Sequence, residues 1–200
     1  MRLEGKVALI SGGARGMGAA EAKLFSREGA KVVIADVLEA EGRQTEAEIN
    51  EMGGDAIFVT LDVTKQSDWD AAISKTIEQF GKLDVIVNNA GIASRVSIEE
   101  TTVEEWDRIL DINSKGVFLG TKAAIIQMKS QGAGGSVINI SSISGNVGQD
   151  TVAAAYNASK GAVRIFSKSA AIQYARGYKG QHDPSWADSD SHDPSRLGRR

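Results

Sequence analysis

The sequence contains no cysteine, and this absence excludes a disulfide framework and any site built on a thiolate. Proline is also scarce, with two residues in a chain of 200. Apolar runs such as 7–10 and 85–87 are only a few residues long, whereas a helix needs about 20 to cross a bilayer. No apolar segment of the signal-peptide kind follows the first residues. We therefore predict a cytoplasmic protein that does not span a membrane.

The sequence also lacks a large excess of charge of either sign. The chain has 23 lysines and arginines against 26 aspartates and glutamates, a formal net charge of −3. No run of like charges creates a positive field, so a nucleic-acid partner is not expected. With 42% hydrophobic residues, a chain of this length predicts one ordinary globular domain.

Short β-branched runs alternate with longer segments of helical period, which is typical of a parallel sheet covered by helices on both faces. The predicted strands are 7–11, 31–35, 55–61, 84–88 and 136–141. The predicted helices are 16–28, 38–52, 66–80, 103–128 with a bend near Asn113, and 153–176. Gly29, Gly53 and Gly81 lie where helices should end. The predicted fold class is a doubly wound, Rossmann-like parallel α/β sheet.

A glycine-rich turn follows the first predicted strand and contains Gly12, Arg15, Gly16, Met17 and Gly18. Glycine lets the backbone approach a pyrophosphate, and the start of the next helix presents free N–H groups to it. The alternative is a tight turn that binds nothing. The flanking strand and helix, with an acidic residue at the end of the next strand, favour a dinucleotide-binding loop.

That acidic residue is Asp36, whose carboxylate can accept hydrogen bonds from the ribose hydroxyls of the adenosine half of a dinucleotide. The same charge would repel a 2′-phosphate, so we predict NAD in preference to NADP. Arg15 in the turn would partly offset that repulsion. The alternative interpretation is that Asp36 is an ordinary exposed residue at a strand end.

Tyr156 and Lys160 lie four residues apart, so on a helix both side chains face the same way. A cation about 4 Å from a phenolate is worth roughly 4 kcal/mol at an effective dielectric constant of about 20. Lys160 can therefore make Tyr156 an acid–base catalyst. Taken alone, two residues of these types at this spacing are more often an exposed helical pair.

Four motifs in a fixed order resemble the short-chain dehydrogenase/reductase family. They are Gly12-x-x-x-Gly16-x-Gly18, Asn88-Asn89-Ala90-Gly91, Ser141-Ser142 and Tyr156-x-x-x-Lys160. Asp62-Val63 and Asn113 also fit the family pattern, so the likeness extends over residues 3–176. The resemblance implies a nicotinamide-dependent enzyme that interconverts small-molecule alcohols and ketones.

The resemblance also implies roles for single residues. Tyr156 would exchange a proton with the substrate oxygen, Ser142 would donate a hydrogen bond to that oxygen, and Lys160 would also hold the nicotinamide ribose. Asn113 would anchor a water that connects Lys160 to solvent. Structural alternatives are that Ser142 merely ends a strand, and that Asn113 merely caps or bends a helix.

Further roles implied by the resemblance concern the cofactor. Asp62 and Val63 would line the adenine pocket, and Asn89, Ala90 and Gly91 would pack along the cofactor. The neighbouring Asn88 could instead tie two strands together. Family members commonly assemble through two long helices, which correspond here to residues 103–128 and 153–176, so we expect a homo-oligomer.

Residues 177–200 do not follow the pattern of the rest of the chain, and the last two strands that the resemblance implies are missing from the sequence. We predict a dinucleotide-binding catalytic domain over residues 1–176 and an irregular, disordered tail over 177–200. The tail contains His-Asp-Pro-Ser twice, at 182–185 and 192–195, but flexible ligands make a poor metal site, so no metal is predicted.

The tail also suggests a hypothesis about the gene. A permitted back-translation of residues 177–190, read one base later, encodes Gly-Ile-Arg-Val-Asn-Thr-Ile-His-Pro-Gly-Pro-Ile-Gln, which resembles the family's next strand and Pro-Gly turn. The nucleotide sequence would test this frameshift. The alternative function is then a truncated dinucleotide-binding fragment without turnover.

Overall fold

The structure, a computed structural model, describes residues 1–175; the predicted tail and the frameshift hypothesis concern residues outside this range. The described residues form a five-stranded parallel sheet in the order β3-β2-β1-β4-β5. The strands are β1 Val7–Ser11, β2 Lys31–Asp36, β3 Ala56–Thr60, β4 Val85–Asn88 and β5 Ser136–Asn139.

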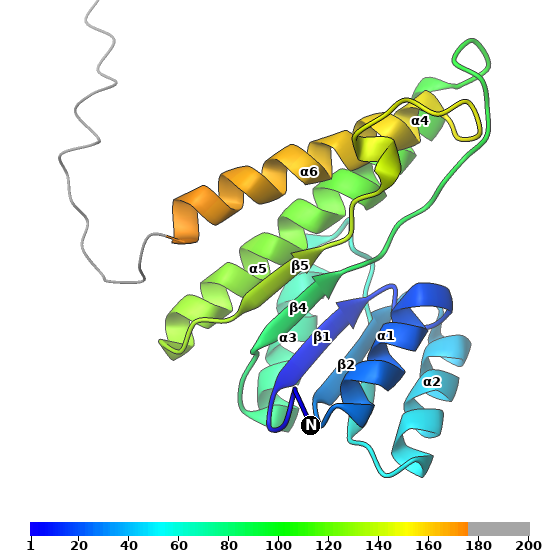
Figure 1. Ribbon diagram of the computed structural model, residues 1–200. Helices are drawn as coiled ribbons and strands as arrows, with labels where there is room; N and C mark the ends of the chain where they lie inside the picture. The colour runs from blue at the N-terminus through cyan, green and yellow to red at the C-terminus, as the bar shows by residue number, and fades with distance from the viewer. Residues whose placement is uncertain (176–200) are drawn as a thin grey trace, which may run out of the picture.

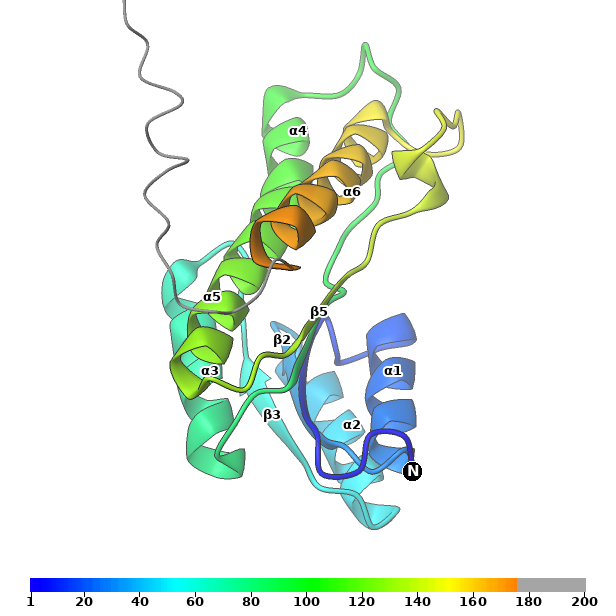
Figure 2. The same cartoon turned by 60° about the vertical axis from the view of Figure 1, so that its left-hand side comes forward.

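Helices cover both faces of this sheet. They are α1 Gly16–Arg27, α2 Glu39–Glu51, α3 Gln66–Phe80, α4 Val103–Leu110, the π-helix η1 Asp111–Lys115, α5 Gly116–Gln131, the 3₁₀-helix η2 Ile143–Gly145 and α6 Ala154–Ala175. Helices α1 and α2 lie on one face and α3 and α5 on the other, with α6 beside α5 (Figure 1; Figure 2). The predicted doubly wound parallel α/β fold is confirmed.

The strand β1 forms the buried centre of the sheet. All five of its residues are buried, and successive side chains enter opposite cores. Leu9 packs in a cluster with Trp69 of α3 and Ala124 of α5, whereas Ile10 packs in a cluster with Ala22 of α1. The end of β1 is therefore a fixed point from which the glycine-rich turn begins.

Several element boundaries differ from the prediction, most of them by one residue. The predicted strand 136–141 ends at Asn139, and the predicted strand 55–61 is shorter at both ends. The predicted helix 103–128 is three segments, because the π-helix η1 separates α4 from α5. The bend expected near Asn113 lies within that π-helix, and α5 continues to Gln131 before Gly132 ends it in a left-handed conformation.

Within residues 1–175, no helix is both long and apolar enough to cross a membrane. The same residues contain no cluster of three or more histidine, aspartate or glutamate side chains placed to hold a metal ion.

Candidate active site

A cavity of about 550 Å³ opens at the carboxyl ends of the strands, next to the beginnings of α1 and α6. Every residue predicted from the sequence to bind a cofactor lines it: Gly12, Arg15, Gly16, Met17, Gly18, Asp36, Asp62, Val63, Asn89, Ala90, Gly91, Tyr156 and Lys160. The remaining lining residues were not predicted to bind the cofactor, although Ser141 belongs to one of the sequence motifs; they are Val37, Leu38, Leu61, Ile92, Ala93, Ile112, Ile140 and Ser141.

The glycine-rich turn is packed tightly against the end of β4. A Cβ atom at Gly12 would lie 2.8 Å from Ala90 Cα, and one at Gly18 would collide with the Gly12 carbonyl oxygen. The Asn89 side chain holds this arrangement, because its Nδ2 donates to the carbonyls of Ser11 at 3.0 Å and Gly12 at 3.2 Å. Asn89 therefore fixes the position of the turn relative to β4.

Ser11 is a second link between the turn and β4. Its buried hydroxyl donates to Val87 O at 3.3 Å and accepts the N–H groups of Asn89 at 3.1 Å and Ala90 at 3.2 Å. Sequence reasoning missed this residue. The available signal was a serine that ends an otherwise apolar strand.

Asp36, the last residue of β2, lines the cavity and is largely buried, with 9% of the residue exposed. One carboxylate oxygen accepts the Ala14 N–H at 3.0 Å, and the other accepts the Leu38 N–H at 3.1 Å. Each oxygen keeps further lone pairs, so the carboxylate can accept additional hydrogen bonds from a ligand in the cavity.

Asp62 and Val63 follow β3 and form another part of the wall. Burial opposes ionisation of Asp62, but hydrogen bonds from Thr64 and the ion pair with Lys65, whose Nζ lies 3.2 Å away, hold the pKa of Asp62 below its usual value. The Val63 carbonyl accepts the indole N–H of Trp69 at 3.0 Å, which anchors this segment to α3.

Tyr156 and Lys160 lie on the first turns of α6, and both line the cavity as their spacing predicts. The Lys160 Nζ lies 5.8 Å from the centroid of the Tyr156 ring and donates to the Ile140 carbonyl at 2.8 Å. Lys160 is 4% exposed, and this burial lowers its pKa. Among the described residues it forms no ion pair, so its charge is directed at the cavity and at the Ile140 carbonyl.

Ser142 and Asn113 do not line the cavity. The half-buried Ser142 lies beyond the end of β5, where its hydroxyl oxygen caps η2 by accepting the Ser144 N–H at 3.1 Å. Contact between Ser142 and a substrate stays a prediction. The preceding Ser141 does line the cavity, and its hydroxyl donates to the Lys160 carbonyl at 2.8 Å.

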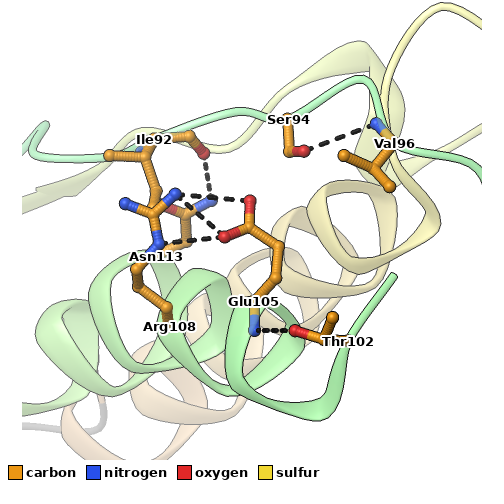
Figure 3. A network of polar contacts seen from close by, with 7 residues as sticks. All are labelled: Ile92, Ser94, Val96, Thr102, Glu105, Arg108 and Asn113. Carbon is orange, nitrogen blue, oxygen red and sulfur yellow. Dashed lines mark hydrogen bonds and ion pairs between the residues drawn. The ribbon is translucent and has the colours of Figure 1, made fainter. Parts of the chain in front are cut away.

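Asn113 is fully buried inside η1. Its Oδ1 accepts the Ile92 N–H at 2.8 Å, and its Nδ2 donates to the Ile92 carbonyl at 2.8 Å and to the Ser159 hydroxyl at 3.0 Å. Figure 3 shows the contact between Asn113 and Ile92 near the ion pair of Glu105 and Arg108. The side chain thus joins η1 both to the wall of the cavity and to α6.

Asn88 joins neighbouring elements, as one interpretation of the sequence expected. Its Nδ2 donates to Asn139 Oδ1 of β5 at 2.8 Å and to Thr121 Oγ1 of α5 at 3.2 Å.

The cavity suits a dinucleotide. No side chain caps the first turn of α1, so the free N–H groups there can bind phosphate oxygens. The open space beyond Gly16 leaves room for a pyrophosphate, Asp36 offers an acceptor for ribose hydroxyls, and Lys160 offers a donor at the opposite end.

Comparisons with known proteins agree with this geometry. A family model described as short chain dehydrogenase matches residues 6–177. The chain belongs to the short-chain dehydrogenase family. The dehydrogenases of this family use NAD or NADP, and the resemblance inferred from the sequence motifs is thereby confirmed.

Similar curated proteins are named dehydrogenases of cyclic alcohols. The trans-4-hydroxycyclohexanecarboxylate dehydrogenase of Sinomonas cyclohexanicum is 51% identical over 177 residues, which are 86% of this chain and 67% of that protein. The cyclopentanol dehydrogenase of Comamonas testosteroni is 47% identical over 174 residues, 87% of this chain and 69% of that protein. The 3-alpha-(or 20-beta)-hydroxysteroid dehydrogenase of Mycobacterium tuberculosis (strain CDC 1551 / Oshkosh) is 50% identical over 177 residues, with 88% of this chain and 66% of that protein covered.

A solved structure has the same fold. The short-chain type dehydrogenase/reductase from Mycobacterium marinum superimposes with a TM-score of 0.84 at 34% sequence identity, covering 86% of this chain and 70% of that one. The chain therefore spans about two thirds of the length of the proteins it matches.

Proposed function

We propose that this chain is an NAD-dependent oxidoreductase that interconverts a secondary alcohol and its ketone. One observation carries the proposal: Tyr156 and Lys160 face the same cavity as the glycine-rich turn and Asp36. A proton-transfer group and a dinucleotide cradle then meet in one site. Residues 1–176 would form the catalytic domain.

In this proposal Tyr156 is the acid–base residue. The bound nicotinamide cofactor supplies or accepts the hydride at the substrate carbon. In the direction of reduction, the Tyr156 hydroxyl gives its proton to the substrate oxygen, and in oxidation it takes that proton back. Lys160 would support Tyr156 from its buried position beside the ring, with its Nζ 5.8 Å from the ring centroid. Ser142 would donate a hydrogen bond to the substrate oxygen, on which negative charge develops.

The remaining predicted residues would hold the cofactor and support the site. Gly12, Gly16, Met17 and Gly18 would bind the pyrophosphate through backbone atoms, and Asp62, Val63, Asn89, Ala90 and Gly91 would line the rest of its length. Asn113 would anchor a water leading to Lys160, and Lys160 would bind the nicotinamide ribose.

For the substrate we propose a cyclic secondary alcohol or ketone. Three similar dehydrogenases are named for hydroxycyclohexanecarboxylate, cyclopentanol and hydroxysteroid, all of which are ring compounds that carry a hydroxyl. Exposed apolar side chains of Ile143 and Val147 follow Ser142 and would contact such a ring.

We also propose assembly into a homo-oligomer through the two long helices. Apolar side chains are exposed on both: Phe118 and Ile126 on α5, and Ile165 and Ile172 on α6. Phe118 and Phe166 pack edge to face with their ring centroids 6.1 Å apart, so the two helices present one continuous surface.

The proposed function is tested by calorimetric titration with NADH together with absorbance assays on cyclopentanone, 4-oxocyclohexanecarboxylate and a ketosteroid. Binding with turnover of at least one ketone supports the proposal. Binding without turnover supports the alternative of a dinucleotide-binding fragment, and absence of binding contradicts both.

Replacement of Asp36 by alanine should weaken NAD binding about tenfold or more and leave NADP binding unchanged or improved. The change removes both the ribose acceptor and the charge that repels a 2′-phosphate. Titrations of both cofactors with the wild type, Asp36→Ala and Asp36→Asn measure this. The asparagine variant keeps an acceptor without the charge, so it should gain NADP affinity while losing less NAD affinity. Equal losses for the two cofactors would contradict the role of Asp36.

The affinity for NADH should fall several-fold as the pH rises from 7 to 10. Because burial lowers the pKa of Lys160, its cation is lost below the ordinary lysine value of about 10.4, and with it a donor to the ribose. Titrations at intervals of pH measure the trend. The Lys160→Gln variant should bind NADH weakly at every pH, and a trend that persists in this variant would assign it to another group.

A further inference from the structure

Ser159 lies between Tyr156 and Lys160 on α6 and is fully buried. Its hydroxyl donates to the Tyr156 carbonyl at 2.7 Å and accepts the Asn113 Nδ2–H at 3.0 Å. The backbone carbonyl of Ser159 accepts the Ser114 hydroxyl at 3.2 Å. The side-chain hydroxyl and the backbone carbonyl of Ser159 are thus each hydrogen-bonded to a residue of η1.

Asn113 in turn is hydrogen-bonded to Ile92, which lines the wall of the cavity. Asn113 makes two hydrogen bonds with the backbone of Ile92, one through Oδ1 and one through Nδ2, both at 2.8 Å. A Cβ atom at Gly91 would lie 3.2 Å from Asn113 Oδ1 and 3.5 Å from Lys160 Nζ, so these two groups meet beside the same glycine. A continuous chain of hydrogen bonds therefore joins the Ile92 segment to the turn of α6 that carries Tyr156.

The π-helix η1 makes this series of hydrogen bonds possible. In η1 the wider turn places Asn113 in the interior with 0% exposure while the adjacent Ser114 still reaches the Ser159 carbonyl. Such turns are rare and are frequently found at functional sites. Every polar atom of the Asn113 amide has a partner, and two of its hydrogen bonds, to Ile92 O and to Ser159, use the same nitrogen.

We propose that Ser159 is a positioning residue that sets the location of Tyr156 and Lys160 relative to the cofactor-facing segment at Ile92. Ser159 does not line the cavity, so it acts through Asn113 and Tyr156 and touches neither substrate nor cofactor. Without its hydroxyl, one Asn113 N–H has no acceptor in a buried place, and Asn113 must move to find one. The inference rests on the proposed function, since it assigns the positioning of the proposed acid–base residue.

Ser167 provides a matched control on the same helix. Its hydroxyl donates to the Val163 carbonyl at 2.7 Å and accepts the Asn139 Nδ2–H at 2.9 Å, which is the same pair of contacts that Ser159 makes. Ser167 lies two turns further along α6, away from Tyr156. Replacement of either serine by alanine therefore removes hydrogen bonds of the same kind, but those of the half-buried Ser167 lead through Asn139 to Asn88, and neither of these asparagines lines the cavity.

The experiment compares wild type, Ser159→Ala, Ser159→Cys and Ser167→Ala in ketone reduction at a temperature below all four melting transitions. For Ser159→Ala we expect kcat to fall about tenfold or more, with KM for the ketone and Kd for NADH within about twofold. Ser167→Ala should keep the wild-type kcat. Cysteine fills nearly the same space with a weak donor and acceptor, so Ser159→Cys should fold and show an intermediate loss of kcat.

A second measurement does not depend on turnover. Hydrogen exchange of the Ile92 amide, which donates to Asn113, should be faster in Ser159→Ala and Ser159→Cys and unchanged in Ser167→Ala. A wild-type kcat in Ser159→Ala, or an unchanged Ile92 exchange rate, would overturn the proposal. If the wild type itself shows no turnover, the proposed function fails, and the exchange measurement alone decides whether Ser159 positions this segment.

Discussion

Replacement of Tyr156 by phenylalanine is expected to lower kcat for ketone reduction by about 10²–10⁴-fold while Kd for NADH stays within about twofold. The phenylalanine ring fills the same space, so the first turn of α6 and the position of Lys160 should be preserved. Only the hydroxyl that gives the proton is lost. The Lys160 ammonium keeps its hydrogen bond to the Ile140 carbonyl and continues to face the cofactor.

Tyr174→Phe is the matched control for this prediction, because Tyr174 belongs to the same helix but is 47% exposed and does not line the cavity. This variant should retain full turnover. Single-turnover measurements with a preformed NADH complex separate the chemical step from binding. If Tyr156→Phe keeps more than about a tenth of the wild-type rate, another group donates the proton and the assignment of Tyr156 is wrong.

The shared helix face of Tyr156 and Lys160 could be predicted from local geometry alone, whereas their place in an active site was predicted from the family resemblance. A spacing of four residues puts two side chains on one helix face, whatever the rest of the fold does. The glycine-rich turn and Asp36 are also predictable, since both lie at the ends of strands in a parallel sheet and must reach the same edge. These residues all line the cavity.

The contacts of Ser11 and Ile140 could not be predicted, because each joins a side chain to a backbone group far away in the sequence. Lys160 donates to the carbonyl of Ile140, and the Ser11 hydroxyl binds the backbone at the end of β4. Backbone carbonyls and N–H groups occur at every residue, so the sequence contains no signal for the one that becomes a partner. Only the tertiary arrangement selects it.

The structure of the segment around Asn113 could be predicted only in part. The sequence indicated a bend, since polar residues interrupt the apolar period there, but nothing in it distinguishes a kink from a π-helix. The difference matters, because the π-helix brings Asn113 to Ile92 and Ser159. For Ser142, the place after a strand could be predicted. The short helix η2, which its hydroxyl caps, could not.

Replacement of Gly16 by alanine should weaken NADH binding on the order of 100-fold, equivalent to about 2.7 kcal/mol. Gly16 has a φ of +59° and lines the cavity, and apart from its chain neighbours and the backbone of its own helix no protein atom lies within 4 Å of the position that a Cβ would take. An added methyl group would therefore point into the open space where we propose that the pyrophosphate binds. The methyl group meets no protein atom, so its steric effect should be confined to the ligand.

Gly5→Ala isolates the part of this effect that comes from the backbone. Gly5 has a φ of +68° and also has nothing within 4 Å of a Cβ, but it lies before β1 and does not line the cavity. Both substitutions force alanine into the left-handed region at a cost of about 1–2 kcal/mol, which lowers the melting temperature by about 2–8 °C in a protein of this size. Thermal melts should therefore be similar for the two variants, while calorimetric titration should show lost NADH affinity only for Gly16→Ala. Equal NADH affinities in the two variants would mean that the cofactor does not pass over Gly16, and the proposed site of the pyrophosphate would have to be abandoned.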